Sequence, residues 1–188
     1  MKKITAVFCL MTFLFCSGFT QQNYNGENFT ADEGEFFTQN VELCSSSSTK
    51  TYMDYRLIDD RTSRQYQYIN ENMTVDETTG LLHDEQGFIG VALGSYYGEI
   101  GTRYYFTLDS GIVLPLVKIE EKSDNHTVKG CYHASDKSVI EFVIDIKIAK
   151  EFFKDKENNV IKTGNFNDDE NFAGKILAVE KLIEDTVK

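Results

Sequence analysis

The feature that most constrains the fold of this chain is a series of short apolar and β-branched segments separated by glycine-marked turns. Phe88–Leu93 is mostly apolar and lies between two glycines, which is typical of a buried strand. Thr102–Leu108 and Ile112–Ile119 flank an Asp-Ser-Gly turn, and this arrangement predicts a β-hairpin. Further strands are expected at Tyr52–Ile58, Tyr66–Ile69 and Ser138–Ile146. The pattern favours a mainly β fold that is closed or nearly closed.

Helical signals are confined to the second half of the chain. Lys147–Lys154 has its apolar residues spaced for one helical face. Phe172–Val187 fits an amphipathic helix, but Gly174–Leu182 also fits a strand, and the periodicity of so short a run does not separate the two. We therefore expect one or two short helices beside the strands.

The first twenty residues have the order of a secretory signal. Lys2 and Lys3 precede the apolar run Ile4–Phe15, and the small residues Cys16, Ser17 and Gly18 follow. The run is short for a transmembrane span, although an uncleaved anchor is the alternative. This segment predicts a secreted or cell-surface protein that has no membrane contact once the signal is removed.

Charge excludes several classes of partner. The chain has 30 Asp and Glu against 19 Lys and Arg, a formal net charge of −11 and a sequence pI near 4.7. Removal of Lys2 and Lys3 with the signal would take the net charge to −13. Because phosphate contacts need a surplus of basic residues, we expect no nucleic-acid partner. The same charge opposes passive adhesion to anionic membranes or wall polymers.

The length of 188 residues indicates a single folded domain after the signal. Residues 21–49 are polar and are expected to form a flexible leader; the alternative is that Phe36, Phe37, Val41 and Leu43 pack as a first strand. The domain is expected over residues 50–183, with its core at 50–150, and residues 184–188 form a tail. We expect a monomer.

Two cysteines, Cys44 and Cys131, remain after removal of the signal. Export makes a disulfide chemically accessible, and these two residues allow only one intramolecular pairing. If formed, the bond closes a long loop; the alternative is two unrelated thiols.

Chemistry-bearing motifs are sparse. The sequence has no phosphate-binding glycine loop, no Cys or His pair at zinc spacing and no Gly-x-Ser-x-Gly elbow, so we expect no cofactor and no metal. Tryptophan is absent but ten tyrosines are present, and Tyr96 and Tyr97 could provide a stacking platform for a sugar. Asp124 lies in a dense polar stretch, where a solvated turn is the alternative to a functional role. Asp145 ends an apolar strand and could instead cap the following helix.

The span from Val91 to Asp145 contains three stretches of note: Ile100–Tyr105, Lys122–Thr127 and Glu141–Asp145. They resemble the double-psi β-barrel domains of secreted Gram-positive proteins, close to the group called 3D domains, with RlpA-like and MltA-like wall enzymes and expansins as more distant relatives. Two further stretches, Lys50–Tyr55 and Val91–Tyr97, are similar to a subgroup of exported Firmicutes proteins without assigned function. The resemblance implies a six-stranded double-psi β-barrel. Where 3D domains have Thr-Gly-Gly after the first Asp, this chain has Asn-His-Thr at 125–127.

This resemblance also implies a role on peptidoglycan or a related cell-wall glycan. In the enzymatic relatives two Asp on neighbouring strands cleave a glycan, and Asp124 and Asp145 are the matching residues. Such cleavage needs one carboxyl that stays protonated near neutral pH, and a nearby carboxylate favours that state. His126 is assigned a helper role, and the residues assigned to substrate binding are Tyr96, Tyr97, Arg103 and Lys122. The alternatives are a non-catalytic module that binds a glycan or peptide, and a structural or interaction protein of the cell surface.

Overall fold

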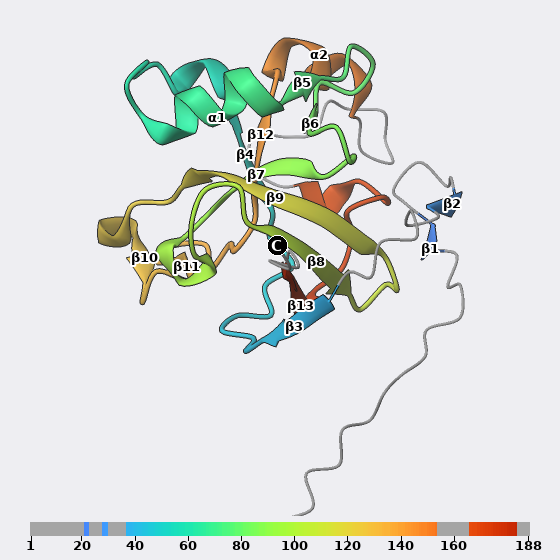
Figure 1. Ribbon diagram of the computed structural model, residues 1–188. Coiled ribbons are helices and arrows are strands. Elements are labelled where there is room, and N and C mark those ends of the chain that lie inside the picture. Colours follow the sequence, from blue (N-terminus) through green and yellow to red (C-terminus); the bar gives the residue numbers. More distant parts are fainter. Residues whose placement is uncertain (1–20, 23–27, 30–36, 154–165, 184–188) are drawn as a thin grey trace, which may run out of the picture.

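A computed structural model describes residues 37–153 and 166–183, together with the backbone of residues 21–22 and 28–29. The expected signal at 1–20 and the tail at 184–188 lie outside the described residues. Over the described part the protein is mainly β, with one large mixed sheet and two α-helices (Figure 1).

The large sheet has nine strands in the described part of the chain. Its main path runs in the order β3 (Phe37–Val41), β13 (Ile176–Ile183), β8 (Arg103–Leu108), β9 (Val113–Glu121), β7 (Ile89–Leu93), β12 (Glu141–Ile144) and β4 (Thr51–Asp54). The short strands β5 (Thr74–Val75) and β6 (Leu82–His83) attach to β7 through β6. The pairs β7–β9 and β4–β12 are parallel, and all the others are antiparallel.

Smaller elements surround this sheet. β1 (Gln21–Gln22) pairs with β2 (Asn28–Phe29), and β10 (Thr127–Val128) pairs with β11 (Tyr132–His133). Four 3₁₀ helices are present in the described residues: η1 (Tyr55–Leu57), η2 (Ser95–Tyr97), η3 (Asp124–His126) and η4 (Phe166–Asp168). Figure 1 shows the helices α1 and α2 at one end of the molecule and the strands β3 and β13 at the other.

The two α-helices correspond to one wrong prediction and one confirmed prediction. The expected strand at Tyr66–Ile69 is wrong, because these residues lie inside α1 (Arg64–Asn72). The Ser63 side chain accepts a hydrogen bond from the Tyr66 backbone N–H and caps this helix, and Ile69 is buried. The expected helix after the Glu141 strand is confirmed as α2 (Ile146–Phe152), and Asp145 is its N-cap.

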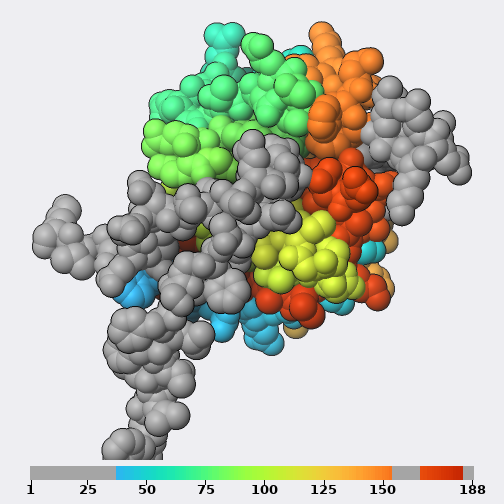
Figure 2. Space-filling model, turned by 90° about the vertical axis from the view of Figure 1, so that its right-hand side faces the viewer, coloured from blue at the N-terminus to red at the C-terminus, as the bar shows by residue number. Residues whose placement is uncertain are grey.

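The hairpin and the C-terminal segment settle two further expectations. The hairpin is confirmed as β8 and β9, which pair from Arg103–Val117 to Thr107–Val113. The C-terminal segment is the strand β13, paired between β8 and β3. In Figure 2 the turn that joins β8 to β9 (yellow-green) lies beside the red C-terminal segment. The Asp109 carboxylate in that turn accepts a hydrogen bond of 2.8 Å from the Lys175 backbone N–H.

Both faces of the sheet are apolar. Along β7, Val91 and Leu93 belong to one buried cluster, which also contains Phe106 and Phe142. Ala92, between them, belongs to a second cluster, which includes Val143 and, from α1, Ile69. Side chains alternate between faces along a strand, so a strand as apolar as β7 requires cover on both sides.

The segment that precedes the expected domain is partly built into the fold. Residues 37–41 form β3 on the edge of β13, as in the alternative interpretation of this segment. Cys44 and Cys131 form a disulfide, with their Cα atoms 6.4 Å apart. The Tyr97 hydroxyl lies 3.4 Å from the Cys44 sulfur. The disulfide therefore ties the region after β3 to the loop between β10 and β11.

Candidate functional site

The candidate site is the surface where η2 meets the β10–β11 hairpin. Their backbones are in contact, because the Tyr96 N–H donates a hydrogen bond of 3.1 Å to the Gly130 carbonyl. A Cβ on Gly94 would collide with the same carbonyl, and Gly130 has a positive φ of 66°. These two glycines permit a close approach that other residues would prevent.

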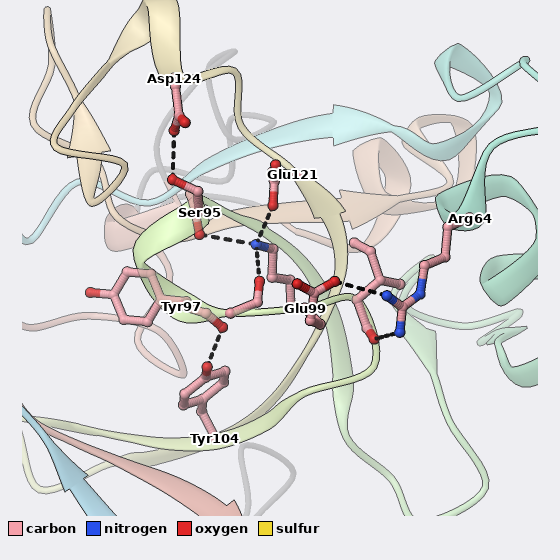
Figure 3. Close-up of polar contacts among 11 residues, drawn as sticks. Arg64, Ser95, Tyr97, Glu99, Tyr104, Glu121 and Asp124 are labelled. Atoms are coloured by element: carbon pink, nitrogen blue, oxygen red, sulfur yellow. Dashed lines mark hydrogen bonds and ion pairs between the residues drawn. The ribbon is translucent and has the colours of Figure 1, made fainter.

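Tyr96 and Tyr97 are neighbours in η2 but differ in burial. Tyr97 is 1% exposed, and burial raises the pKa of its hydroxyl. Its backbone carbonyl accepts a hydrogen bond from the Tyr104 hydroxyl (Figure 3). Tyr96 is 41% exposed, with its ring edge-on to Tyr97 at a centroid distance of 5.3 Å. Its hydroxyl donates a hydrogen bond of 3.0 Å to the Glu42 carbonyl, so this exposed ring is held at both ends.

Lys118 positions the η2 loop from beneath. Its side chain is fully buried, and its Nζ donates hydrogen bonds to the carbonyls of Gly94 and Gly98, at 3.0 Å and 2.5 Å. The third partner is the Glu121 carboxylate at 2.8 Å. This role of Lys118 was not predicted, although a single lysine within the apolar run Ile112–Ile119 indicates a buried charge that needs partners.

Asp124 and His126 lie on the solvent side of this surface. The Asp124 carboxylate accepts a hydrogen bond of 2.6 Å from the Ser95 hydroxyl, as Figure 3 shows. His126 is exposed, and its ring centroid lies 6.3 Å from that of His133. His133 Nδ1 in turn lies 3.0 Å from the Ser135 hydroxyl. Hydroxyl, carboxylate and imidazole groups therefore accompany the exposed Tyr96 ring.

Asp145 does not belong to this surface. Its carboxylate accepts hydrogen bonds of 2.9 Å and 3.2 Å from Arg56 and one of 2.9 Å from the Lys147 backbone N–H. Arg56 also bonds Asp54, and this hydrogen bond lowers the pKa of the Asp54 carboxyl. Asp145 therefore acts as a helix cap and as one half of an ion pair.

The register of β7 separates Asp124 from Asp145. Phe142 pairs with Val91, so Asp145 lies beyond the start of β7, whereas Asp124 bonds Ser95 beyond its end. The five residues of β7 lie between these two positions, and at about 3.3 Å per residue they span about 16 Å along the strand. Glycoside cleavage requires about 5–10 Å between its two carboxyls. The structure thus does not bring the two predicted catalytic Asp together.

Arg103 and Lys122, which were assigned to substrate binding, have intramolecular partners. Arg103 donates to the buried Asp84 carboxylate at 2.8 Å and to Gln86 at 2.6 Å. Lys122 is 8% exposed, its Nζ lies 3.3 Å from the Ser138 hydroxyl, and burial lowers its pKa. These contacts support the fold, and we do not include either residue in the candidate site.

A different carboxylate pair lies across the sheet. Glu120 on β9 and Glu141 on β12 both pair with Ala92 on β7, which lies between them. Adjacent strands are about 4.8 Å apart, so the backbones of the two glutamates are about 10 Å apart on one face. Burial raises the pKa of Glu120, and the charges of Glu121 and Glu141 raise it further. Burial and the neighbouring negative charges thus both favour the protonated form of Glu120.

Other kinds of site were sought in the described residues. A pocket with an empty volume of about 210 Å³ lies beside α2; it is lined by Tyr52, Ile144, Ile146, Ala149, Lys150, Phe153 and Phe166. None of these residues belongs to the surface around Tyr96. Within the described ranges, no group of three His, Cys, Asp or Glu side chains is placed to hold a metal ion. No helix in that part of the chain has the length and apolar character needed to cross a bilayer.

Comparisons with family models, with curated proteins and with solved structures give no match for this chain.

Proposed function

We propose that this protein is exported and binds a cell-wall glycan, peptidoglycan or a related polysaccharide, through the surface around Tyr96. In this proposal the six strands β4, β7, β8, β9, β12 and β13 form a double-psi β-barrel, with β3 and the β5–β6 hairpin added outside it. The two parallel pairs β7–β9 and β4–β12, formed by strands distant in sequence, support this topology. The N-terminal segment Lys2–Gly18 supports export.

The observation that carries the proposal is the fixed, exposed ring of Tyr96. Sugars present C–H faces that pack on aromatic rings, and a ring held in place before binding loses little conformational entropy. Tyr96 is anchored through Glu42 and Tyr97, and the Ser95–Asp124 pair beside it offers hydrogen-bonding groups to sugar hydroxyls. Binding is favoured over cleavage at this surface because Asp145 is remote and engaged with Arg56.

The test is co-sedimentation of the purified protein with purified Gram-positive cell wall. Tyr96→Ala is expected to reduce bound protein about two- to tenfold, since aromatic contacts of this kind contribute about 0.5–1.5 kcal/mol. Tyr96→Phe keeps the ring but removes its hydrogen bond to the Glu42 carbonyl, so its binding should lie between those of wild type and Tyr96→Ala. Leu57→Ala, at a side chain that is 70% exposed on η1, is the matched control and should not change binding. Equal binding by Tyr96→Ala and wild type would refute the proposal.

A second candidate function is cleavage of the same glycan, and the Glu120–Glu141 pair favours it. Its acid would be Glu120, whose pKa is raised by burial. The same wall suspension can be assayed for soluble fragments released by wild type and by Glu120→Gln. Release that is lost in Glu120→Gln while sedimentation is unchanged would assign catalysis to this pair. Release that is equal in both proteins, or absent from both, removes Glu120 from any chemistry.

A further inference from the structure

We infer that the outer edge of β3 is a self-association surface, through which two copies of this chain pair their β3 strands antiparallel around a two-fold axis at Gln39. The inference is independent of glycan binding and differs from the monomer expected from the sequence. The occupant of the edge is a second copy of the protein.

The first observation is that β3 forms one end of the sheet. Among the described residues it pairs with β13 alone, from Val41–Val179 to Phe37–Ile183. Its other edge thus presents backbone N–H and C=O groups to any strand that can align with it. Phe37, Thr38, Gln39 and Asn40 are all exposed, so side chains do not shield this edge.

The second observation is that β3 lacks the features that usually protect an edge strand. Natural edges carry charges, prolines or bulges that discourage pairing. The sequence of β3, Phe-Thr-Gln-Asn-Val, has no charge and no proline in a chain of net charge −11, and its register with β13 is continuous. Two copies of so acidic a chain repel each other, but the uncharged β3 strands can approach each other without placing like charges in contact.

The opposite end of the sheet, at β4, is covered by contrast. The Lys50 carbonyl, next to β4, accepts a hydrogen bond of 2.7 Å from the Phe166 N–H. The Lys50 ammonium donates one of 2.7 Å to the Gly174 carbonyl, and β4 itself carries the charged Asp54. The sheet is thus covered next to β4 at one end, whereas the outer edge of β3 at the other end can pair with a further strand.

Self-pairing at Gln39 is complementary residue by residue. An antiparallel pair centred there places Phe37 opposite Val41 of the second copy, Thr38 opposite Asn40, and the two Gln39 amides opposite each other. Aromatic and β-branched residues are favourable cross-strand partners. Phe37, which is 51% exposed, would gain cover from Val41 of the second copy.

The position of β3 is also fixed by contacts of the residues that follow it. The Cys44–Cys131 disulfide and the hydrogen bond from Tyr96 to the Glu42 carbonyl fix the chain directly after β3. A strand that is already fixed in place loses less conformational entropy when it pairs with another strand.

The experiment is sedimentation equilibrium of the purified protein from about 5 to about 500 µM, a range suited to a small interface. Wild type should dimerise. Gln39→Lys and Gln39→Glu, each of which sets like charges across the two-fold axis, should weaken the dimer about two- to fivefold. An equimolar mixture of the two variants should restore association as a heterodimer. Gln67→Lys, the same substitution at an exposed position of α1, is the control and should behave as wild type.

Two results would overturn the inference. One is a wild-type protein that remains monomeric across the whole range. The other is a dimer that Gln39→Lys and Gln39→Glu leave unchanged, which would place the contact elsewhere. The rescue by mixing separates a lost contact from a misfolded variant, because two misfolded chains would not restore each other.

Discussion

Three buried lysines, Lys50, Lys118 and Lys122, hold loops of this protein in place through backbone or hydroxyl oxygens. Burial of an ammonium group is unfavourable in free energy unless the group is hydrogen-bonded, so we assign all three lysines a structural role. Lys50 has the largest consequence for stability, because burial lowers its pKa from 10.5 to about 8.

Lys50 predicts a stability that rises with pH in alkaline solution. Below about pH 8 both the folded and the unfolded chain hold the proton, so the unfavourable burial of the charge is fully present. Between about pH 8 and 10.5 the folded protein releases the proton while the unfolded chain retains it, and the free energy of unfolding therefore increases. From pH 7.5 to 9.5 we expect a gain of about 2 kcal/mol for wild type over Lys50→Met.

Urea unfolding at the two pH values measures this gain. Comparing wild type with Lys50→Met cancels the titration of other groups, including Tyr104, whose pKa burial raises to about 12. A pH dependence that is the same in both proteins would show that Lys50 is not the group responsible.

Single residues also mark how far the sequence could predict the site. Tyr96 and Tyr97 were predicted together as a sugar platform, but only Tyr96 is exposed, because Tyr97 is buried in the core. The capping role of Asp145 was open as an alternative and is confirmed by its bond to the Lys147 N–H. Its Arg56 partner was not predictable, because 89 residues separate the two and no local pattern joins them.

At the scale of elements, local patterns predicted those strands and turns that depend on neighbours in sequence. The β8–β9 hairpin is one, because its turn lies between its two strands. The helix α1 was missed, because its only fully buried residue is Ile69 and its other apolar residues are half-exposed tyrosines. The state of the C-terminal segment is fixed by pairing of β13 with β8 and β3, which its own periodicity does not report.

The disulfide is the element-scale feature with the clearest test. It closes a loop between residues 87 apart in sequence, and the chain-entropy relation for such a loop gives about 4–5 kcal/mol of stabilisation. Guanidinium unfolding with and without reductant should therefore differ by about this amount. The double variant Cys44→Ala, Cys131→Ala should match the reduced protein and should not respond to reductant.

Alkylation followed by mass measurement under non-reducing conditions is the control for that experiment. Alkylation of both Cys44 and Cys131 would show that the disulfide is not formed in the purified protein. In that case reductant would leave the unfolding curve unchanged.

At the scale of the whole molecule, the topology lay beyond the reach of the sequence pattern. The parallel pairs β7–β9 and β4–β12 join segments that no short-range signal relates, and β12 lies between β4 and β7 although it follows both in sequence. The same arrangement separates Asp124 from Asp145. The sequence predicted that Asp145 follows a strand, which is confirmed, but its distance from Asp124 depends on which strands are neighbours and in which register.

The net charge of −11 predicts how wall binding should respond to salt. Wall polymers are anionic, so net charge opposes the proposed wall binding at long range, while the proposed stacking on Tyr96 and hydrogen bonds would act at contact and be insensitive to salt. Raising the ionic strength from about 10 to about 100 mM shortens the screening length from about 30 to about 10 Å. Binding to whole wall should therefore strengthen severalfold over this range.

An uncharged wall-derived oligosaccharide provides the matched comparison, because no long-range repulsion acts on it. Its affinity for the protein should change by less than about twofold over the same salt range, since only charged partners are screened. Both affinities should fall together in Tyr96→Ala, whereas the slope with salt should stay the same because the net charge does not change. Wall binding that weakens as salt rises would mean that attraction between charges dominates, and would exclude Tyr96 stacking as the main source of affinity.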